Sequence, residues 1–388
     1  MSAAFEPIWV TELDLDQAPR DLVAPVGARY TRVRCLVRRG EEPLGCVALA
    51  LHEGRVPVAH LAATLPPGCG EPGATPRPRP VTVVVCTRER PQALTVALAS
   101  LLACDPEPLE IVVVDSAPRT DATEKVIHDL ADERLRLVRE PRGGLSRARN
   151  LGVSEARGEV IAFTDDDVRV DRAWLRGLLR GLDRAPHVAC VTGAVHAAEL
   201  ETPAQLYFDE KAGWGGPGSP RLYDLGTNRV DSPLYPYLPG TFGAGANFAV
   251  TKALLASIGA FDEALGAGSP AAGGEDLDLF LRVLRAGLAI AHEPSAVVWH
   301  YHRREEQALC RQLVGYGSGL TALASKLLIS SETSQDAISR LRPAAGRVRS
   351  ISGRGRGGKG GARLRAAEVW GLMLGPPRYL RGRLGGVP

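Results

Sequence analysis

The 388-residue chain has no cysteine pair at metal-binding spacing, no cysteine–histidine cluster, and no apolar run of the roughly 18 residues that a membrane-spanning helix needs. Its seven cysteines are scattered, which excludes a compact disulfide framework. Its first residues are acidic where a signal peptide has a basic and then an apolar segment. We therefore expect a cytoplasmic protein with reduced thiols, either soluble or attached to the inner face of a membrane.

Positive charge is concentrated at one end of the chain. The net charge is +3, but residues 341–388 contain eleven Lys and Arg and one acid, Glu368, so they carry +10 and the remainder carries −7. This basic tail predicts contact with an anionic surface, either membrane headgroups or nucleic acid. Within it, the Gly/Arg-rich stretch 351–362 predicts disorder, and the helix-like segment 363–384 is expected to be broken by Pro376–Pro377.

Changes in composition divide the chain into four segments. Residues 1–65 show strand-like alternation and predict a small β-rich unit, and residues 66–80 form a linker rich in proline and glycine. Residues 81–330 have the composition of a large globular domain, and residues 331–388 form the basic, partly disordered tail. Residues 197–240, rich in Gly, Pro, Tyr and Trp, predict a long loop that carries specificity.

Short β-branched runs and helix-like segments alternate at the start of the large domain. Strands are predicted at 81–86, 109–115, 135–140 and 159–167, and helices at 91–103, 122–132 and 144–156. This order predicts an α/β fold built from right-handed βαβ units, with a mostly parallel sheet flanked by helices. Because ligands bind at the carboxyl ends of the strands in such sheets, we expect polar residues there to converge on one crevice.

Three consecutive acids, Asp165, Asp166 and Asp167, end the fourth predicted strand. Alternate residues of an extended segment face the same way, so Asp165 and Asp167 can face one ion while Asp166 faces another group. Carboxylate oxygens suit Mg²⁺ or Mn²⁺, which would in turn bind the diphosphate of a nucleotide. The alternative is a solvated acidic turn or a cap for the helix that follows.

Two other segments carry residues suited to a nucleotide. Asp115 ends the second predicted strand, where its carboxylate could accept hydrogen bonds from a base or ribose or could cap the next turn. The segment 143–150 opens a helix with two glycines, Arg147, Arg149 and Asn150. Helix N-terminal amides and arginines favour phosphate, although Arg147 could equally lie on a solvated helix face.

Acids at 275–278 and histidines at 300 and 302 could supply a catalytic base and a further metal ligand. Glu275, Asp276 and Asp278 open a helix, where they could cap it or provide a general base for an acceptor hydroxyl. His300 and His302 lie on one face of an extended segment, so either could join the metal site or simply be packed.

Taken together, these motifs resemble the family 2 glycosyltransferases, which are inverting enzymes with the GT-A fold. The resemblance covers about residues 80 to 300 and rests on five stretches: 81–91, 110–116, 144–168, 243–265 and 273–287. It implies a Rossmann-like sheet of GT-A type. It also implies metal-dependent transfer of a sugar from a nucleotide-diphosphate donor to the hydroxyl of a glycan, a lipid-linked molecule or a small molecule.

The resemblance also implies roles for individual residues. Asp165 and Asp167 correspond to the family's DxD pair, with Asp167 as the more direct ligand, and His300 is expected near the metal or the diphosphate. Asp276, next to Glu275, corresponds to the catalytic base. The remaining donor-site residues implied are Thr87, Arg88, Arg90, Asp115, Arg149, Asn150, Asp166 and Asn247, the last of which would shape the sugar and acceptor pocket.

Departures from the family pattern narrow the expected function. The QxxRW motif of processive members is absent after residue 300, which favours the addition of one or a few sugars. A sugar nucleotidyltransferase is the alternative enzyme, but the turn at 87–94 lacks the glycine-rich loop that it needs. A third alternative is a non-catalytic nucleotide-sugar-binding or RNA-binding protein. We prefer a membrane surface to nucleic acid as the partner of the tail, because its Gly/Arg stretch has no aromatic residue.

Overall fold

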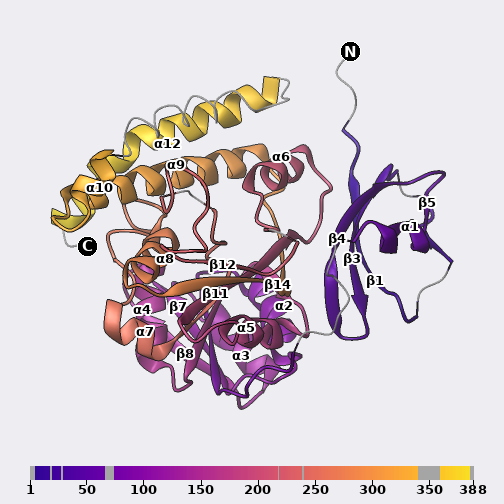
Figure 1. Cartoon of the computed structure of the whole chain (residues 1–388), viewed down its shortest axis with the longest axis horizontal. Coiled ribbons are helices and arrows are strands. Elements are labelled where there is room, and N and C mark those ends of the chain that lie inside the picture. Colours follow the sequence, from indigo (N-terminus) through magenta and orange to yellow (C-terminus); the bar gives the residue numbers. More distant parts are fainter. Residues whose placement is uncertain are drawn as a thin grey trace.

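The computed structural model describes residues 5–339, apart from 18–19, 28, 66–73, 217 and 238–239, together with residues 359–384. A nine-stranded sheet runs through the centre of these described residues (Figure 1). Its strand order is β10-β14-β11-β13-β9-β6-β7-β8, with β12 beside β14. The strands are β6 (Val81–Thr87), β7 (Glu110–Ser116), β8 (Leu135–Glu140), β9 (Val160–Asp165), β10 (Val168–Val170), β11 (Val188–Ala197), β12 (Arg221–Tyr223), β13 (Asn247–Thr251) and β14 (Ala289–His300).

Most of this sheet is parallel, which confirms the predicted α/β class. Strands β6, β7, β8, β9, β11 and β14 run in one direction, and β10, β12 and β13 run against them. The predicted strands at 81–86, 109–115 and 135–140 match β6, β7 and β8 to within one residue at either end. The fourth ends earlier than expected, at Asp165, because Asp166 and Asp167 form a turn into β10.

Helices cover both faces of the sheet. Helices α2 (Pro91–Leu102), α3 (Ala122–Leu130) and α5 (Trp174–Leu182) pack on one face, and α4 (Leu145–Glu155), α7 (Lys252–Ile258) and α8 (Glu275–Arg285) pack on the other. Successive strand residues point to opposite faces, so Val83 and Val85 join the core under α2 while Val84 joins the core under α4. This two-sided burial explains why β6 is apolar without alternation.

The first 65 residues contain a separate sheet, of order β1-β3-β4, drawn in indigo in Figure 1. Its elements are β1 (Ile8–Asp14), β3 (Arg32–Arg39) and β4 (Glu42–Ala50), accompanied by β2 (Asp21–Val23), β5 (Arg55–Pro57) and α1 (Val58–Ala63). One face of this sheet has its own apolar core. The other face places Leu36 against Val297 and Trp299 of β14. Ion pairs surround this contact, among them Arg38 with Asp171 and Arg180 with Glu42.

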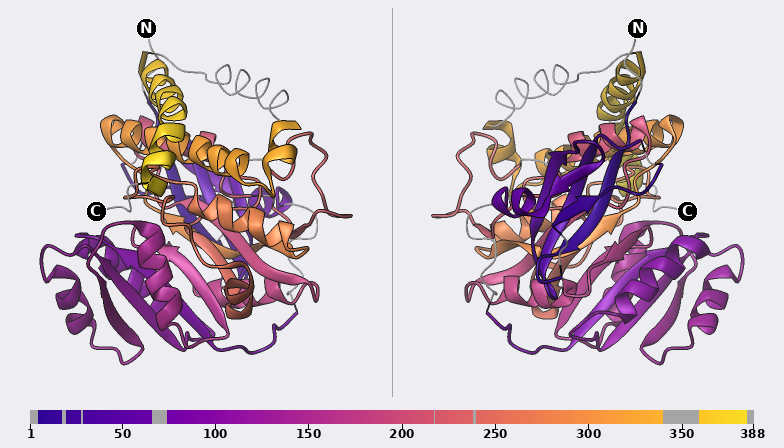
Figure 2. Two further views of the ribbon diagram at one scale, coloured as in Figure 1. Left: turned by 90° about the vertical axis from the view of Figure 1, so that its left-hand side faces the viewer. Right: turned by 90° about the vertical axis from the view of Figure 1, so that its right-hand side faces the viewer.

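Helices form the side of the molecule opposite the strands β6–β8 (Figures 1 and 2). They are α6 (Pro203–Ala212), α9 (Glu306–Ile329), α10 (Ser334–Ser339) and α12 (Lys359–Leu384). Helix α6 was not predicted, since residues 197–240 were expected to form a loop. It begins with a capping box between Thr202 and Gln205 and has Pro203 at its first position. Among the described residues, no helix is both long and apolar enough to cross a membrane.

The prediction that Pro376–Pro377 breaks the C-terminal helix is wrong, because α12 continues through both prolines to Leu384. Proline at position 376 frees the carbonyl of Leu372 from its helical hydrogen bond. That carbonyl instead accepts a hydrogen bond from the hydroxyl of Thr321 in α9, at 2.8 Å. Most of the stretch expected to be disordered, 351–362, lies outside the described residues.

Helices α9 and α12 pack closely because glycines line their contact. A Cβ atom at Gly371 would lie 2.3 Å from the carbonyl oxygen of Val314. A Cβ atom at Gly375 would lie 2.0 Å from Oγ1 of Thr321 and 2.4 Å from the carbonyl oxygen of Ser318. These distances leave no room for a side chain, so the two glycines determine how closely the helices approach.

We predict that Gly375→Ala destabilises the protein, although alanine favours a helix by about 1 kcal/mol over glycine. The added methyl group must push α12 away from α9, at a cost of about 1–3 kcal/mol beyond that gain. Urea unfolding measures the change, and limited proteolysis reports the release of α12. Gly361→Ala, in the same helix, is the matched control, because its Cβ would meet only the flexible end of the Arg365 side chain, at 3.3 Å. An increase in stability for Gly375→Ala would contradict the close-packing argument.

Candidate active site

The acidic triplet lies where β9 turns into β10, and sheet pairing brings a histidine to it. Strand β10 pairs with β14, so Val168 stands opposite His300. Asp165, Asp167 and His300 each offer one ligand atom, and these atoms lie within 4.8 Å of one another. The Nε2 atom of His300 is 3.3 Å from Oδ1 of Asp167. These are the three residues that the sequence suggested as metal ligands.

The donor set of this cluster fits a hard divalent cation. Two carboxylates and one imidazole are ligands that Mg²⁺ and Mn²⁺ accept, and a softer metal would favour thiolates. Asp167 and His300 are buried, whereas Asp165 is partly exposed. Within the cluster, Asp167 and His300 are therefore shielded from solvent, and Asp165 lies on the side that a ligand can approach.

Burial and neighbouring charges shift the pKa values of Asp165 and Asp167 in opposite directions. Burial raises the pKa of Asp165 to about 6, against the opposing effect of Arg149. Burial would also raise the pKa of Asp167, but His300, Arg303 and Arg90 hold it well below its usual value. Asp167 is therefore ionised across the physiological range, as a metal ligand must be.

Arg149 joins this cluster to the start of α8. The residue is buried, and its Nη1 donates a hydrogen bond to Oε1 of Glu275 at 2.9 Å. Its Nη2 lies 3.4 Å from Oδ1 of Asp165 and donates to the carbonyl oxygen of Gly245 at 2.9 Å. Burial and the adjacent Asp276 raise the pKa of Glu275 to about 7. The arginine thus compensates two carboxylates that would otherwise be costly to bury.

Asp276 differs from Glu275 in its exposure. Its side chain is half-buried, and its Oδ2 accepts a hydrogen bond from the backbone N–H of Gly245 at 2.8 Å. Glu275 lies behind it, 6% exposed and paired with Arg149. Of the two acids, Asp276 is the one that an incoming hydroxyl can reach.

The ends of β6 and β7 provide a second group of polar residues. The two strands pair so that Thr87 stands beside Asp115. The hydroxyl of Thr87 donates to Asp166 at 2.8 Å, and Arg90 donates to Asp166 at 3.0 Å and to Asp167 at 3.2 Å. The first and fourth predicted strands therefore converge as expected.

Asp115 has unused hydrogen-bonding capacity. The residue is 2% exposed, and its Oδ1 has no hydrogen-bond partner within the described residues. Burial raises its pKa, partly offset by Thr123. A buried carboxylate oxygen without a donor is costly, so this atom is suited to a ligand N–H or hydroxyl group. Arg88, in the neighbouring turn, is exposed.

Two predicted donor-site residues are instead engaged within the protein. Asn247 is fully buried, and its amide bonds Trp174 and the backbone carbonyls of Ala194 and Ala296. The amide of Asn150 donates to the carbonyl of Phe261 and accepts from its N–H. Both asparagines therefore hold neighbouring segments in place.

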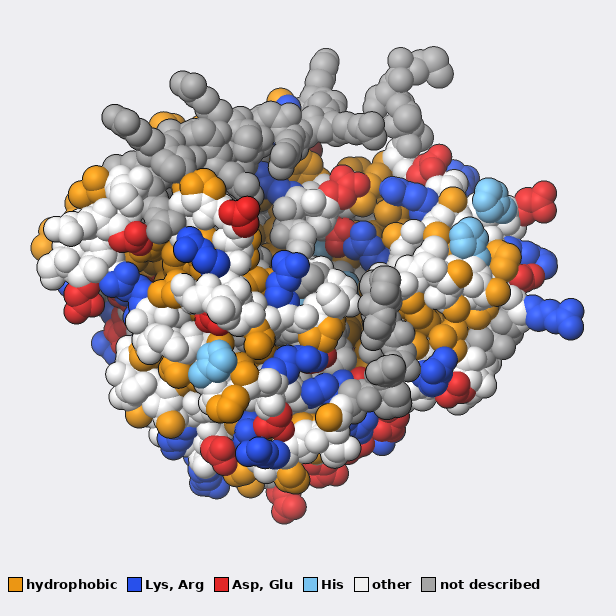
Figure 3. All heavy atoms as spheres, in the orientation of Figure 1, with side chains coloured by type: hydrophobic (Ala, Val, Ile, Leu, Met, Phe, Trp, Pro, Cys, Tyr) orange, Lys and Arg blue, Asp and Glu red, His pale blue; other side chains and the backbone are white. Residues whose placement is uncertain are grey.

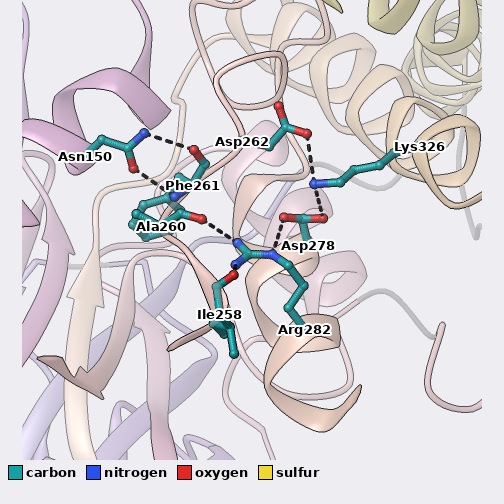
Figure 4. A pocket seen from close by; sticks show the side chains of 8 residues that line it. All are labelled: Asn150, Ile258, Ala260, Phe261, Asp262, Asp278, Arg282 and Lys326. Atoms are coloured by element: carbon teal, nitrogen blue, oxygen red, sulfur yellow. Dashed lines mark hydrogen bonds and ion pairs between the residues drawn. The ribbon is translucent and has the colours of Figure 1, made fainter. Parts of the chain in front are cut away.

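Asn150 also borders a pocket that is separate from the acidic triplet (Figure 4). The pocket is lined by Asn150, Ile258, Ala260, Phe261, Asp262, Asp278, Arg282 and Lys326. Lys326 pairs with Asp262 at 2.8 Å and with Asp278 at 2.7 Å, and Arg282 pairs with Asp278 at 2.9 Å. The charges that line this pocket therefore already neutralise one another.

The structure adds residues that the sequence did not indicate. Arg303 lies 3.2 Å from Asp167 and provides a further positive charge. The ring of Trp214 packs edge-on against His300 with centroids 5.7 Å apart, and Tyr316 lies beside Trp214 at 6.1 Å. Arg303 immediately follows the two histidines in the chain, which was an available signal. Trp214 and Tyr316 reach the site only through the packing of α6 and α9.

Comparison with known proteins agrees with this geometry. Residues 82–250 match the family described as Glycosyl transferase family 2. The chain is 28% identical over 256 residues to the pre-mycofactocin glycosyltransferase of Mycobacterium tuberculosis, covering 65% of this chain and 49% of that protein. It is 28% identical over 264 residues to human polypeptide N-acetylgalactosaminyltransferase 3, covering 62% and 40%. The chain thus spans about half or less of the length of these curated relatives.

A solved structure shows the same fold. The mannosyltransferase PcManGT of Pyrobaculum calidifontis, in complex with GDP-Man and Mn²⁺, matches with a TM-score of 0.51 and 20% sequence identity. The match covers 80% of this chain and 90% of that one. The sheet and its flanking helices therefore have the GT-A fold that the motifs suggested.

We predict that Glu275→Gln reduces the pH dependence of stability in metal-free buffer. Folding raises the pKa of Glu275 from about 4.5 to about 7, so between these pH values the folded protein binds a proton that the unfolded chain does not. The stability that this proton provides is lost as the pH rises through that range. The wild-type free energy of unfolding should therefore fall by roughly 2–3 kcal/mol more than that of the variant over this range. Urea unfolding between pH 5 and 8 measures both. Glu124→Gln, an exposed change in α3, is the control, and parallel curves for Glu275→Gln would refute the prediction.

Proposed function

Residues 82–250 form a glycosyl transferase family 2 domain, and from this premise we propose that the protein transfers a sugar from a nucleotide-diphosphate donor to an acceptor hydroxyl. The observation that carries the proposal is the grouping of Asp165, Asp167 and His300 within 4.8 Å, beside the ends of β6 and β7. This arrangement supports a cation-dependent reaction. The transfer is inverting and adds one or a few sugars.

The donor occupies the carboxyl ends of β6, β7 and β9. The unpartnered oxygen of Asp115 accepts a hydrogen bond from the base or ribose. Thr87 lies beside Asp115, Arg88 and Arg90 follow it in the turn after β6, and the two arginines compensate the phosphate charge. Asp165, Asp167 and His300 would hold Mg²⁺ or Mn²⁺, which when bound neutralises charge on the diphosphate leaving group.

The acceptor approaches from the side of α8. Asp276 takes the proton of the attacking hydroxyl, while its hydrogen bond from Gly245 keeps the carboxylate oriented. Attack opposite the leaving diphosphate inverts the anomeric centre in one displacement. Arg149 neutralises Glu275 and Asp165, so that both side chains keep their positions while negative charge develops on the leaving diphosphate.

A membrane surface is the proposed location of the reaction, on its cytoplasmic side. Helix α12 turns its glycines toward α9 and exposes an apolar stripe on its other face. The stripe contains Val369 (43% exposed), Trp370 (55%), Met373 (59%), Leu380 (46%) and Leu384 (86%). The helix carries six Lys and Arg and one Glu. Exposed apolar residues together with basic residues on one helix favour an anionic lipid surface.

The stripe on α12 contrasts with other parts of the surface. On the face drawn in Figure 3, basic and acidic side chains are interspersed, so their charges neutralise locally. In α12, Arg363 pairs with Glu306 of α9 and Glu368 pairs with Lys211 of α6. Six Lys and Arg against one Glu still give the helix a net positive charge. The predicted contact therefore depends on the helix itself rather than on a general basic surface.

Metal-dependent nucleotide binding tests the proposed function. We expect one of UDP, GDP and dTDP to bind in calorimetry with Mn²⁺ and to bind more weakly without it. Asp167→Ala should weaken this binding by at least about tenfold, because a metal ligand is lost. Asp129→Ala removes an exposed carboxylate on α3 and should bind as the wild type does. If none of the three nucleotides binds the folded protein, the proposed function fails.

Vesicle sedimentation tests the membrane contact. We expect the protein to bind vesicles that contain an anionic phospholipid. The double change Trp370→Ser and Met373→Ser should weaken binding by at least about tenfold, since it removes two apolar side chains from the lipid-facing stripe. Val96→Ser, at an exposed apolar position of α2, should have no effect. Equal binding by the double variant would show that α12 is not the contact.

A further inference from the structure

Four side chains link the N-terminal sheet to the candidate metal site. Nη1 of Arg34, in β3, lies 2.6 Å from both carboxylate oxygens of Asp209, in α6. Oδ1 of Asp209 lies 3.8 Å from Nε2 of His302. Nδ1 of His302 lies 2.9 Å from Nδ1 of His300, whose Nε2 faces Asp167. The contacts therefore run from the guanidinium of Arg34 to the carboxylate of Asp209, then through the two imidazoles to the candidate metal site.

This linkage is shielded from water. Both histidines are 5% exposed, and the Asp209 side chain is 12% exposed. The ring of Phe208 packs edge-on against His302 with centroids 4.8 Å apart. Burial would raise the pKa of Asp209, but His302 and Arg34 hold it below its usual value. An ionised carboxylate in a shielded setting orients its neighbours strongly.

The chemistry of imidazole determines how protons are arranged along the linkage. A neutral imidazole has one N–H donor and one acceptor nitrogen. If Nε2 of His300 holds a cation, its proton must be on Nδ1, which then donates to Nδ1 of His302. Because that nitrogen accepts, the proton of His302 must be on Nε2. This Nε2–H points at Asp209, the carboxylate that Arg34 holds.

We propose that Arg34 and Asp209 are positioning residues for the metal site. Through His302 they hold His300 in the tautomer and orientation that leave Nε2 available to a divalent cation. Histidine ligands in metal sites commonly depend on a carboxylate in this way. The inference rests on the proposed function, and it gives the N-terminal sheet, which lies outside residues 82–250, a positioning role in the site.

Strand β3 offers a matched control. Arg34, Leu36 and Arg38 alternate along the strand and share its docking face. Arg38 pairs with Glu12 and with Asp171, so its loss loosens the docking of the sheet without touching the histidines. Comparison of Arg34 with Arg38 separates positioning of the site from general attachment of the sheet.

The test titrates Mn²⁺ alone into the full chain and follows free Mn²⁺ by electron paramagnetic resonance. We expect His302→Gln to weaken Mn²⁺ binding by about 10- to 100-fold, as is typical for the partner of a ligating histidine. Arg34→Gln and Asp209→Ala act at one or two further contacts and should weaken it by about 3- to 10-fold. Arg34→Lys should restore part of the loss, and Arg38→Gln should bind as the wild type does.

A second readout observes the tautomers directly. Nitrogen-15 spectra of the eight histidines in Mg²⁺-loaded protein, which is diamagnetic, should show His300 protonated on Nδ1 and His302 on Nε2. Asp209→Ala should mix the tautomers of both, and Arg38→Gln should leave them unchanged. A merely structural role for Asp209 would not alter the tautomers.

The outcomes distinguish this inference from the proposed function. If the wild type binds Mn²⁺ and His300→Ala abolishes binding, but Arg34→Gln and Asp209→Ala bind normally, the inference is wrong and the metal site stands. If Arg38→Gln weakens binding as much as Arg34→Gln, the effect comes from docking, and the inference is again wrong. If the wild type binds no Mn²⁺, both the metal site and the inference are overturned.

Discussion

The buried guanidinium of Arg149 connects the two halves of the candidate site. It extends from α4 and contacts Asp165 at the end of β9 and Glu275 at the start of α8. Without a cation between them, these carboxylates would repel each other in a setting that already penalises their charge. A guanidinium presents several donors in a rigid plane, so it can serve both acids and the carbonyl of Gly245 at once.

Strand reversal places the other parts of the site around this contact. The sheet is parallel from β8 to β9, and this brings Thr87, Asp115 and Asp165 to one edge. The reversal at Asp166 and Asp167 then leads into β10, whose antiparallel pairing with β14 delivers His300. The fully buried amide of Asn247 helps to hold this region by joining β13 to α5, β11 and β14.

The segments on either side of the large central sheet attach to it by different means. The N-terminal sheet docks through an apolar centre at Leu36, surrounded by ion pairs of Arg34 and Arg38. Partly buried pairs of this kind give orientation more than affinity. Helix α12 instead docks through glycines that allow close backbone approach to α9. The first arrangement can transmit position to His300, whereas the second leaves an apolar face of the helix exposed.

The sequence alone determined the fold class and predicted which three residues come together in a cluster that could hold a metal ion. Strands β6, β7 and β8 and helices α2, α3 and α4 depend on local periodicity and on glycine and proline punctuation, which are readable residue by residue. Asp165, Asp167 and His300 were predicted together from motif order. Helix α6 was missed because the abundance of Gly, Pro and aromatic residues concealed its capping box. The continuation of α12 through two prolines was also missed, because the compensating donor, Thr321, lies on another helix.

Only the tertiary structure decided how individual polar groups are used. Asn150 and Asn247 have the residue type of ligand-binding groups, but packing gives both amides hydrogen-bond partners within the protein. Asp276 and Glu275 are adjacent in the chain, yet one is accessible and the other is paired with Arg149. Arg34 gave no sequence signal, because its relation to His300 depends on contacts that run from β3 through α6 to the end of β14. Local pattern specifies secondary structure, whereas the environment of a charge depends on long-range packing that no local pattern contains.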